Sequence, residues 1–190
     1  MIVLGLTGSI GMGKTTTAGL FRARGVPVWD ADAAVHTLYS KGGAAVAPLA
    51  DLLPDAVRDG AVDRAVLRQE IEDTPAALAQ IEAIVHPLVA EDRRRFLDGN
   101  APFVVLDIPL LFETGLSGDV DRIAVVSVPE AVQRARVLAR GTMSAAQLDA
   151  ILAKQLPDRD KRAQADYIID TTSPETARRG VDAILEELLP

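Results

Sequence analysis

The sequence contains no cysteine and only two histidines among its 190 residues. Disulfide bonds and thiol catalysis are therefore excluded, and a zinc ion would have to rely on two widely separated histidine side chains. Aromatic residues make up 4% of the chain, whereas hydrophobic residues as a whole make up 48%. The core must therefore be built mainly from Leu, Val, Ile and Ala, as is typical of a soluble α/β or α protein.

The chain also lacks an excess of basic residues, because its net charge is −7. General nucleic-acid binding needs a broad basic surface, so we expect no nucleic-acid partner, although a local Lys/Arg cluster can still bind a small anion. The start MIVLGLTG is unlike a signal peptide, and no apolar run approaches the ~20 residues that span a membrane. We therefore expect a cytoplasmic protein without a membrane partner, either a monomer or a weak homo-oligomer.

Short apolar runs alternate with helical patterns along most of the chain. Five runs predict buried strands, at 2–6, 26–32, 103–112 (broken by Pro109), 122–128 and 166–170. Helices are predicted at 14–24, 129–140, 144–156 and 173–189, the last two with Ser144 and Ser173 as N-caps. Strands that alternate with helices predict an α/β fold whose mostly parallel sheet is covered on both faces.

Residues 33–100 differ from the rest, because they hold Ala/Leu-rich helical stretches and no long β run. We interpret them as a helical insertion, with helices at 65–73, 75–85 and 87–99. His86 precedes Pro87, so it can bind substrate, or it can simply end a helix that the proline disturbs. The run Arg93–Arg95 spreads over different helix faces, which favours a solvated surface over an anion site.

The stretch GSIGMGKTTT contains the spacing G-x-x-x-x-G-K-[ST], formed by Gly8, Gly13, Lys14 and Thr15. It follows a predicted strand and precedes a predicted helix, which is the context that a phosphate-binding loop requires. Glycines let the backbone approach phosphate closely, and the helix N-terminus supplies partial positive charge. Lys14 can then reach the β- and γ-phosphates and Thr15 can hold Mg²⁺. The alternative is a flexible glycine turn with an exposed lysine.

The loop predicts a bound nucleoside triphosphate but does not name the reaction. A GTP-dependent switch normally carries NKxD and DxxG, whereas the one asparagine here, Asn100, is followed by alanine, and no aspartate is followed by glycine three positions later. The small size, the helical insertion and an arginine-bearing helix favour a small-molecule kinase instead.

A kinase needs a group that orients the acceptor hydroxyl and accepts its proton. Asp32 lies at the expected carboxyl end of the second strand, where open α/β sheets bind ligands. If residues 26–32 are extended, Asp30 and Asp32 share one face. We therefore interpret Asp32 as the base or substrate orienter and Asp30 as a supporting carboxylate; the alternative is that Asp32 caps the following helix.

Two further groups are candidates near the phosphates. Asp107 ends the apolar strand FVVLD, so its carboxylate can reach Mg²⁺, or it can contact the acceptor or fix the loop. Gln133, Arg136 and Arg140 share one face of a helix, from which an arginine can neutralise charge on the transferring phosphate. The alternative for that face is a solvated amphipathic helix, and Arg134 is expected to point elsewhere.

The chain resembles the dephospho-CoA kinase family. The resemblance covers most of the length and rests on LTGSIGMGKTT, VWDAD, DGAVDRAVLR, IEAIVHPLV, VVLDIPLLFE, the Q-x-x-R-x-x-x-R spacing ending at Arg140, and ADYIID. It departs from the usual family pattern at Ser9, Met12 and Thr15, and DTTSPE replaces a more common DN-x-G after the last strand. The resemblance implies ATP-dependent phosphorylation of the ribose 3′-hydroxyl of dephospho-CoA, with CoA and ADP as products.

The resemblance also implies a three-layer α/β/α P-loop kinase fold with a five-stranded, mostly parallel sheet. Its parts would be a nucleotide-binding core (1–32, 101–135 and 160–190), a helical CoA-binding region (33–100) and a lid (136–159). Residues implied to bind the ATP phosphates and Mg²⁺ are Gly8, Gly11, Met12, Gly13, Lys14, Thr15, Thr16, Arg136 and Arg140, with Asp107 as second metal ligand. Residues implied at the acceptor site are Asp32, as base, His86, Asp107, Leu110, Leu111, Phe112 and Glu113. Lys14 and Arg140 would join Asp32 in catalysis.

Overall fold

The structure, a computed structural model, describes residues 1–189, which fall into two compact units. The first unit comprises Met1–Trp29 together with the chain from Asn100 onward, and the second comprises Asp30–Gly99. The second unit is therefore inserted between two parts of the first. Each unit has its own hydrophobic core.

A five-stranded sheet with the order β2-β5-β1-β6-β7 lies at the centre of the first unit. The strands are β1 (Ile2–Thr7), β2 (Val28–Asp30), β5 (Phe103–Asp107), β6 (Arg122–Ser127) and β7 (Tyr167–Asp170). The pairs β1–β5, β1–β6 and β6–β7 are parallel, and Leu6 is in register with Asp107. Because parallel strands end at the same edge, the segments that follow β1 and β5 start side by side.

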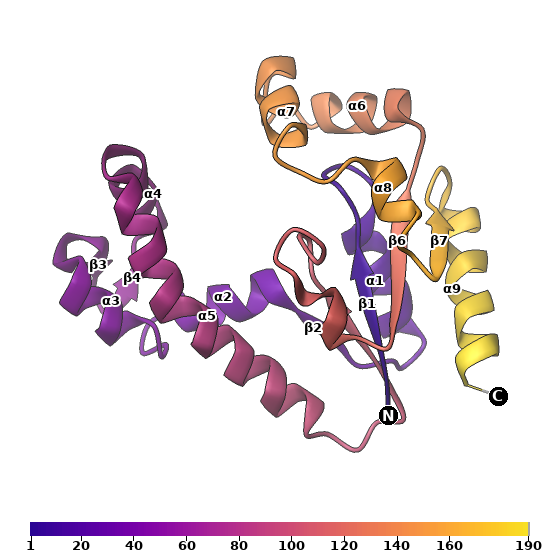
Figure 1. The fold of residues 1–190 in the computed structure, drawn as a ribbon, viewed down its shortest axis with the longest axis horizontal. Helices are drawn as coiled ribbons and strands as arrows, with labels where there is room; N and C mark the ends of the chain where they lie inside the picture. Colours follow the sequence, from indigo (N-terminus) through magenta and orange to yellow (C-terminus); the bar gives the residue numbers. More distant parts are fainter. Residues whose placement is uncertain (190) are drawn as a thin grey trace. The chain divides into compact units, whose positions relative to one another are not determined.

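Helices surround this sheet, as Figure 1 shows. They are α1 (Lys14–Ala23), η2 (Leu116–Asp119), α6 (Glu130–Ala139), α7 (Ala145–Leu152), α8 (Asp158–Arg162) and α9 (Pro174–Leu188). Helices α1 and α9 pack against each other, α9 contacts β7 and α8 contacts β6. The predicted α/β fold with a parallel sheet and helices around it is thereby confirmed.

The core of the first unit is mainly aliphatic, as the shortage of aromatic residues requires, and two phenylalanines complete it. Leu4, Leu6, Phe21, Val105 and Val126 are all fully buried in it. The outer helices begin at the predicted N-caps, because Ser144 accepts a hydrogen bond from Gln147 N and Ser173 from Thr176 N. Such caps each contribute about 1 kcal/mol to helix stability.

The second unit is mainly helical, as predicted for the insertion. Its elements are α2 (Ala31–Tyr39), α3 (Val46–Leu52), η1 (Pro54–Ala56), β3 (Val57–Arg58), β4 (Ala61–Val62), α4 (Arg64–Asp73) and α5 (Pro75–Leu97). Leu38, Leu49, Leu67, Ile81 and Val85 form its buried core. The two-stranded hairpin β3–β4 was not predicted, because strands of two residues leave no period in the sequence.

The strand expected over 26–32 is shorter than predicted, and this changes the position of Asp32. Strand β2 ends at Asp30, and Asp32 lies in the first turn of α2. The expectation that Asp30 and Asp32 share one strand face is therefore wrong. Asp30 is the N-cap of α2, and its Oδ1 accepts a hydrogen bond from Ala33 N at 3.0 Å. This cap stops the strand and begins the helix, and it gives Asp30 the structural role expected for it.

A single helix runs through Pro87, where two helices were predicted. Helix α5 extends from Pro75 to Leu97, so His86 does not end a helix. Proline inside a helix costs about 3 kcal/mol because it removes one hydrogen bond and crowds the preceding turn. Pro87 and Ala83 are both exposed, so water can bond the carbonyl of Ala83 that Pro87 leaves unpaired.

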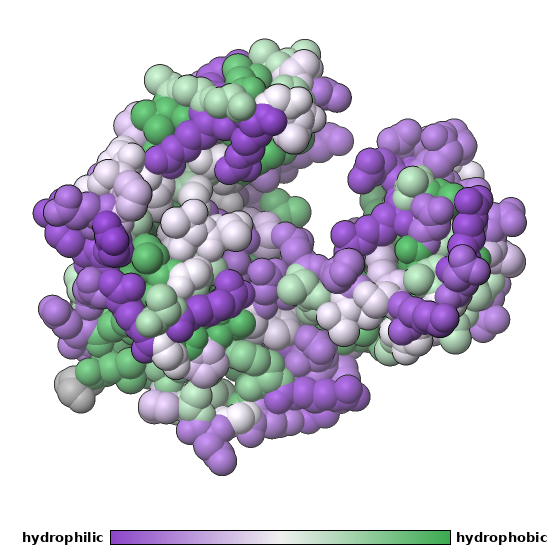
Figure 2. Space-filling model, turned by 180° about the vertical axis from the view of Figure 1, so that it is seen from behind, coloured by the Kyte–Doolittle hydropathy of each residue, from purple (hydrophilic) through white to green (hydrophobic). Residues whose placement is uncertain are grey.

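Among residues 1–189, no helix is both long enough and apolar enough to cross a membrane. On the face shown in Figure 2, hydrophilic residues surround smaller hydrophobic areas, in keeping with a chain of which 25% is charged.

Candidate functional site

The loop between β1 and α1 has the backbone shape of a phosphate cradle. Gly11 and Gly13 have φ values of 79° and 92°, in the left-handed region that only glycine enters at low cost. The first hydrogen bond of α1 runs from Thr17 N to Gly13 O, so the N–H groups of its first turn have no partner within the helix. These N–H groups and the helix dipole favour an anion at this place.

The glycines also let neighbouring elements pack directly on the loop. A Cβ added to Gly8 would lie 2.3 Å from Val126 Cγ2 on β6. A Cβ on Gly11 would lie 2.5 Å from Val137 Cγ2 on α6, and one on Gly13 would lie 3.0 Å from Thr171 Oγ1. The motif glycines therefore serve close packing as well as the turn itself.

Replacement of Gly8 by alanine tests this packing. We expect Gly8→Ala to destabilise the fold by about 1–3 kcal/mol, the usual cost of overpacking a rigid site. Chemical denaturation measures the change, and Gly19→Ala is the matched control because a Cβ there meets nothing within 4 Å. Gly19→Ala should raise stability by up to about 1 kcal/mol, since Gly19 lies inside a helix. Equal stability of the two variants would contradict the packing argument.

Three side chains from distant parts of the chain hold the loop in place. Gln133 Nε2 donates to Ile10 O at 2.7 Å, and Gln155 Oε1 accepts from Ile10 N at 3.3 Å. Thr171 Oγ1 donates to Met12 O at 2.5 Å. The sequence placed Gln133 on a functional helix face without this role, and it gave no signal for Gln155 or Thr171.

Lys14 and Asp107 form an ion pair at the edge where β1 and β5 end. Lys14 Nζ donates to Asp107 Oδ1 at 2.5 Å, and the two side chains are only 15% and 2% exposed. The pair is possible because β1 and β5 are neighbours in register. It brings the lysine of the phosphate loop and the candidate metal carboxylate to the same place.

The first turn of α1 places Thr15 and Thr16 on the exposed side of the helix. Hydroxyl and carboxylate oxygens, such as those of Thr15 and Asp107, are the hard ligands that Mg²⁺ prefers. The described residues contain no cluster of three or more acidic, His or Cys side chains suited to a metal. That is compatible with Mg²⁺ here, because this ion usually keeps several waters and binds through one or two protein groups plus substrate phosphates.

The three side chains on the predicted functional face of α6 differ in exposure. Gln133 is buried, Arg136 is half-buried and Arg140, the C-cap residue, is exposed. Arg136 Nη2 donates to Thr171 O at 2.7 Å and to Thr172 O at 3.2 Å, so this arginine orients the turn after β7. Arg134 points elsewhere, as expected, and its Nη1 pairs with Asp149 Oδ1 of α7 at 2.5 Å.

Two acceptor-site candidates lie in the second unit. Asp32 and His86 are both exposed, on α2 and α5 respectively. Arg94 and Arg95 are exposed, as predicted for a solvated surface, and both pair with Glu91 at 2.9 Å, whereas Arg93 is half-buried. That pairing lowers the pKa of Glu91 through hydrogen bonds from the two guanidinium groups.

The four acceptor-site candidates after β5 lie in different environments. Leu110 is 39% exposed and Phe112 is half-buried, whereas Leu111 is fully buried and its Cδ2 packs beside Gly5. Glu113 Oε1 lies 2.8 Å from Lys161 Nζ and accepts a hydrogen bond from Leu156 N at 2.8 Å. The side chain of Glu113 thus faces α8 and the segment before it.

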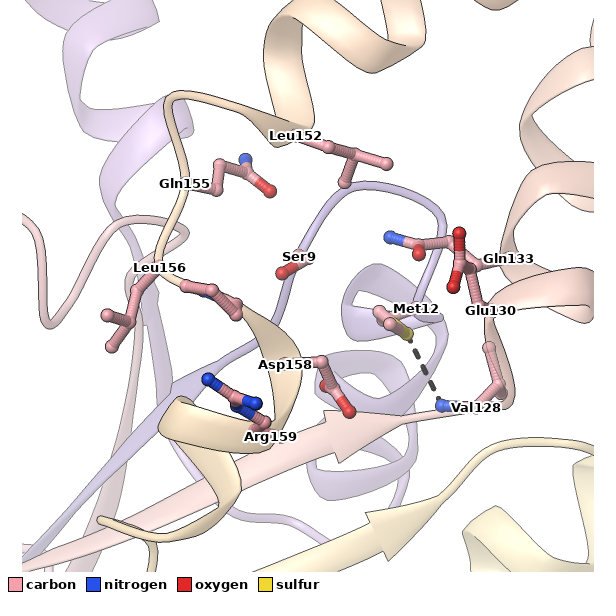
Figure 3. Close-up of a pocket in the computed structure, with 11 residues that line it drawn as sticks. Ser9, Met12, Val128, Glu130, Gln133, Leu152, Gln155, Leu156, Asp158 and Arg159 are labelled. Carbon is pink, nitrogen blue, oxygen red and sulfur yellow. Dashed lines mark hydrogen bonds between the residues drawn. The ribbon is translucent and has the colours of Figure 1, made fainter.

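A cavity of about 360 Å³ adjoins the phosphate loop. Its walls come from Ser9 and Met12 of the loop, Glu130 and Gln133 of α6, Leu152 and residues 155–159. Figure 3 shows the loop passing between Gln133 and Gln155, with the sulfur of Met12 accepting a hydrogen bond from Val128 N at 3.3 Å. The loop is therefore open on this side to a space bounded by the segment predicted to form a lid.

Comparison with known proteins agrees with the resemblance seen in the sequence. The family model described as dephospho-CoA kinase matches residues 2–176. A dephospho-CoA kinase from Cereibacter sphaeroides is 56% identical over 186 residues, which cover 97% of this chain and 94% of the relative.

Solved structures share the fold. A crystal structure from Thermus thermophilus aligns with a TM-score of 0.86 at 36% identity, over 100% of this chain and 98% of the other. Dephospho-CoA kinase from Campylobacter jejuni aligns with a TM-score of 0.74 at 22% identity, over 98% and 96% of the two chains, which supports the fold alone. Because the family model matches most of the chain and a relative shares more than half of its residues, this chain belongs to the dephospho-CoA kinase family.

Proposed function

We propose that this chain transfers the γ-phosphoryl group of ATP to the ribose 3′-hydroxyl of dephospho-CoA, releasing CoA and ADP in the last step of CoA synthesis. The observation that carries the proposal is the match to the family over residues 2–176, together with the shape of the loop that the match includes. Gly11 and Gly13 curve this loop, and Lys14 lies at its end.

The donor half of the reaction uses residues of the first unit. The N–H groups at the start of α1 and the ammonium of Lys14 would hold the β- and γ-phosphates and offset the charge on the transferring group. Asp107 holds Lys14 in an ion pair, so a bound phosphate would share the ammonium of Lys14 with this carboxylate. Arg140 would add a cation from the end of α6.

Mg²⁺ is the metal that this site would take. Thr15 and Asp107 would hold it, with the phosphates of ATP and water completing its coordination. When bound, the ion supplies positive charge that offsets the negative charge of the β- and γ-phosphate oxygens. Asp107 would then serve both Lys14 and the ion.

The acceptor half of the reaction would use the second unit. Asp32 would accept the proton of the attacking 3′-hydroxyl, and its exposure on the first turn of α2 leaves its carboxylate accessible to substrate. His86 of the second unit, and Leu110 and Phe112 of the first, would also contact the acceptor. Residues 33–100 would bind dephospho-CoA together with these two residues, and the first unit would bind ATP.

An acceptor panel tests the proposed function. Purified protein is incubated with Mg-ATP and either dephospho-CoA or a set of nucleoside monophosphates and small metabolites, and ADP release is measured. We expect ADP to form in the presence of dephospho-CoA. ADP formation with a nucleoside monophosphate and none with dephospho-CoA would assign the chain to another small-molecule kinase activity, whereas no transfer at all would indicate a nucleotide-binding regulatory protein.

We also propose that residues 136–159 form a lid that closes over ATP, because phosphoryl transfer must exclude water. Helix α7 lies within this segment, and Asp149 connects it to Arg134 of α6. The absence of cysteine permits specific spin labels at Ala150→Cys on α7 and Arg178→Cys on α9. The distance between the labels should shorten with a non-hydrolysable ATP analogue; an unchanged distance distribution would contradict closure.

A cytoplasmic location and a monomeric or weakly self-associating state stay predictions. Cell fractionation tests the first, and light scattering of the purified protein over a concentration series tests the second.

A further inference from the structure

Lys161 is a cation that is completely buried and that the proposed reaction does not use. It lies on the short helix α8, and its side chain is 0% exposed. Its Nζ lies 2.8 Å from Glu113 Oε1, so the two side chains form an ion pair. The Glu113 side chain is itself only 18% exposed.

Stability alone does not explain why Lys161 is buried beside Glu113. Removing the Lys161 ammonium from water costs several kcal/mol, and an apolar residue of similar volume at such a position often gives an equally stable or more stable protein. A pair of this kind can instead fix the position of the segments that carry it. Glu113 lies after β5 and Lys161 lies on α8, so the pair joins two segments that are far apart in the sequence.

Glu113 holds both ends of a turn that reaches the phosphate loop. Its Oε1 accepts a hydrogen bond from Leu156 N at 2.8 Å and faces Lys161, five positions later in the chain. Gln155, adjacent to Leu156, accepts the N–H of Ile10 at 3.3 Å. The pair thus fixes residues 155–161, and this segment binds, through Gln155, the loop that is expected to hold ATP. In Figure 3, Gln155 lies on the segment beside the part of the loop that carries Ser9.

The same segment is also fastened to the sheet. Asp158 Oδ2 accepts a hydrogen bond from Ser127 Oγ, at the end of β6, at 2.8 Å. Residues 155–161 therefore connect three places: the turn after β5, the end of β6 and the phosphate loop. A displacement of this segment changes the support of Ile10 directly.

The Glu113 carboxylate is ionised at neutral pH. Burial by itself raises the pKa of Glu113, but Lys161 and the Leu156 N–H outweigh this effect and lower the pKa below its ordinary value of 4.5. Because the folded-state pKa is lowered, the contribution of Glu113 to stability is complete above the ordinary pKa and is lost as the pH falls through the lower value.

We propose that Glu113 and Lys161 are positioning residues, which set the place of residues 155–161 and, through Gln155, the Ile10 peptide of the ATP-binding loop. This inference rests on the proposed function, in which that loop binds ATP. It changes the expected role of Glu113, which acts on the donor site through Leu156 and Gln155 and does not contact the acceptor.

The test compares Lys161→Met, Glu113→Gln, the double variant and Gln155→Ala. Lys161→Met keeps the length and bulk of the side chain, Lys161→Arg keeps the charge, and Arg162→Met is the matched control on the exposed side of the same helix. The dissociation constant of a non-hydrolysable ATP analogue is measured without acceptor, near neutral pH, and the KM values for both substrates are measured separately.

We expect the single variants and Gln155→Ala each to weaken ATP-analogue binding by about 3- to 30-fold, the range seen when one link between coupled sites is broken. The KM for dephospho-CoA should stay within about 3-fold, and the double variant should bind no more weakly than the single variants, because both remove one interaction. Lys161→Arg should retain most of the affinity, and Arg162→Met should bind like the wild type.

Two results would overturn the inference. Variants that lose thermal stability but bind the ATP analogue like the wild type would make the pair purely structural. A raised KM for dephospho-CoA in Glu113→Gln alone, with Lys161→Met and Gln155→Ala unchanged, would place Glu113 on the acceptor. If Glu113→Gln fails to fold, Lys161→Met and Gln155→Ala decide the matter, because Gln155 makes no buried ion pair. Failure of the proposed function would appear separately, as a wild type inactive toward dephospho-CoA.

Discussion

Asp32→Asn is expected to lower kcat by ~10²–10⁴, the range for loss of a general base. The amide keeps the size of the carboxylate but accepts a proton far less readily. The structure removes the main alternative role for this residue, because Asp30 and not Asp32 caps α2. The loss should therefore fall on the chemical step rather than on the fold.

The unfolding midpoint of Asp32→Asn should accordingly stay close to that of the wild type, since Asp32 is exposed. Glu186→Gln provides the matched control, because it makes the same carboxylate-to-amide change on the exposed surface of α9. Steady-state kinetics at saturating ATP and dephospho-CoA measures kcat for all three proteins. A kcat for Asp32→Asn equal to that of the control would leave Asp32 as a positioning residue.

Lys14→Ala is expected to lower kcat/KM for ATP by ~10²–10³ or more, by analogy with removal of one group that stabilises transition-state charge. It also leaves Asp107, with a side chain only 2% exposed, without the ammonium 2.5 Å away. Breaking a buried pair from one side costs up to about 3–5 kcal/mol. Activity and stability should therefore both fall, for different reasons.

A double-mutant cycle separates the two effects. Lys14→Met and Asp107→Asn are made singly and together, and chemical denaturation gives the free energy of unfolding of each protein. The double variant should lose less unfolding free energy than the sum of the losses of the two single variants, because it leaves no uncompensated charge. It should still be inactive with ATP. Full activity of Lys14→Met would contradict the role of Lys14 in phosphate binding.

The sequence predicted the phosphate loop because all its determinants are local. Gly8, Gly13, Lys14 and Thr15 lie within eight consecutive positions, and the strand before them and the helix after them have clear apolar patterns. The N-caps Ser144 and Ser173 were predictable for the same reason, since a cap and the N–H it binds are three residues apart.

Two local patterns gave the wrong boundary. The sequence VWDAD contains two aspartates two positions apart, and either can cap the next helix. Asp30 is the cap, so the strand ends at Asp30 and Asp32 lies in the helix. Pro87 disfavours a helix in general, because its nitrogen cannot donate a hydrogen bond. Here it lies on an exposed face of α5, where water can replace that hydrogen bond. Tertiary context decided both cases.

The supports of the loop were not predictable, because their partners are far apart in the sequence. Thr171 and Met12 are separated by 159 positions, and Gln155 and Ile10 by 145. Lys161 lies in the run DRDKR, a five-residue helix with no apolar period, and such a lysine is normally exposed. Its complete burial beside Glu113 becomes visible only in the folded chain.

The most direct test of this account is the identity of the phosphorylated product. The protein is incubated with Mg-ATP and dephospho-CoA, the nucleotide products are quantified, and the position of the new phosphate is determined by NMR. We expect one ADP for each dephospho-CoA consumed, and a product with its new phosphate on the ribose 3′-oxygen. Release of ADP without dependence on dephospho-CoA, or a phosphate at any other position, would contradict the account.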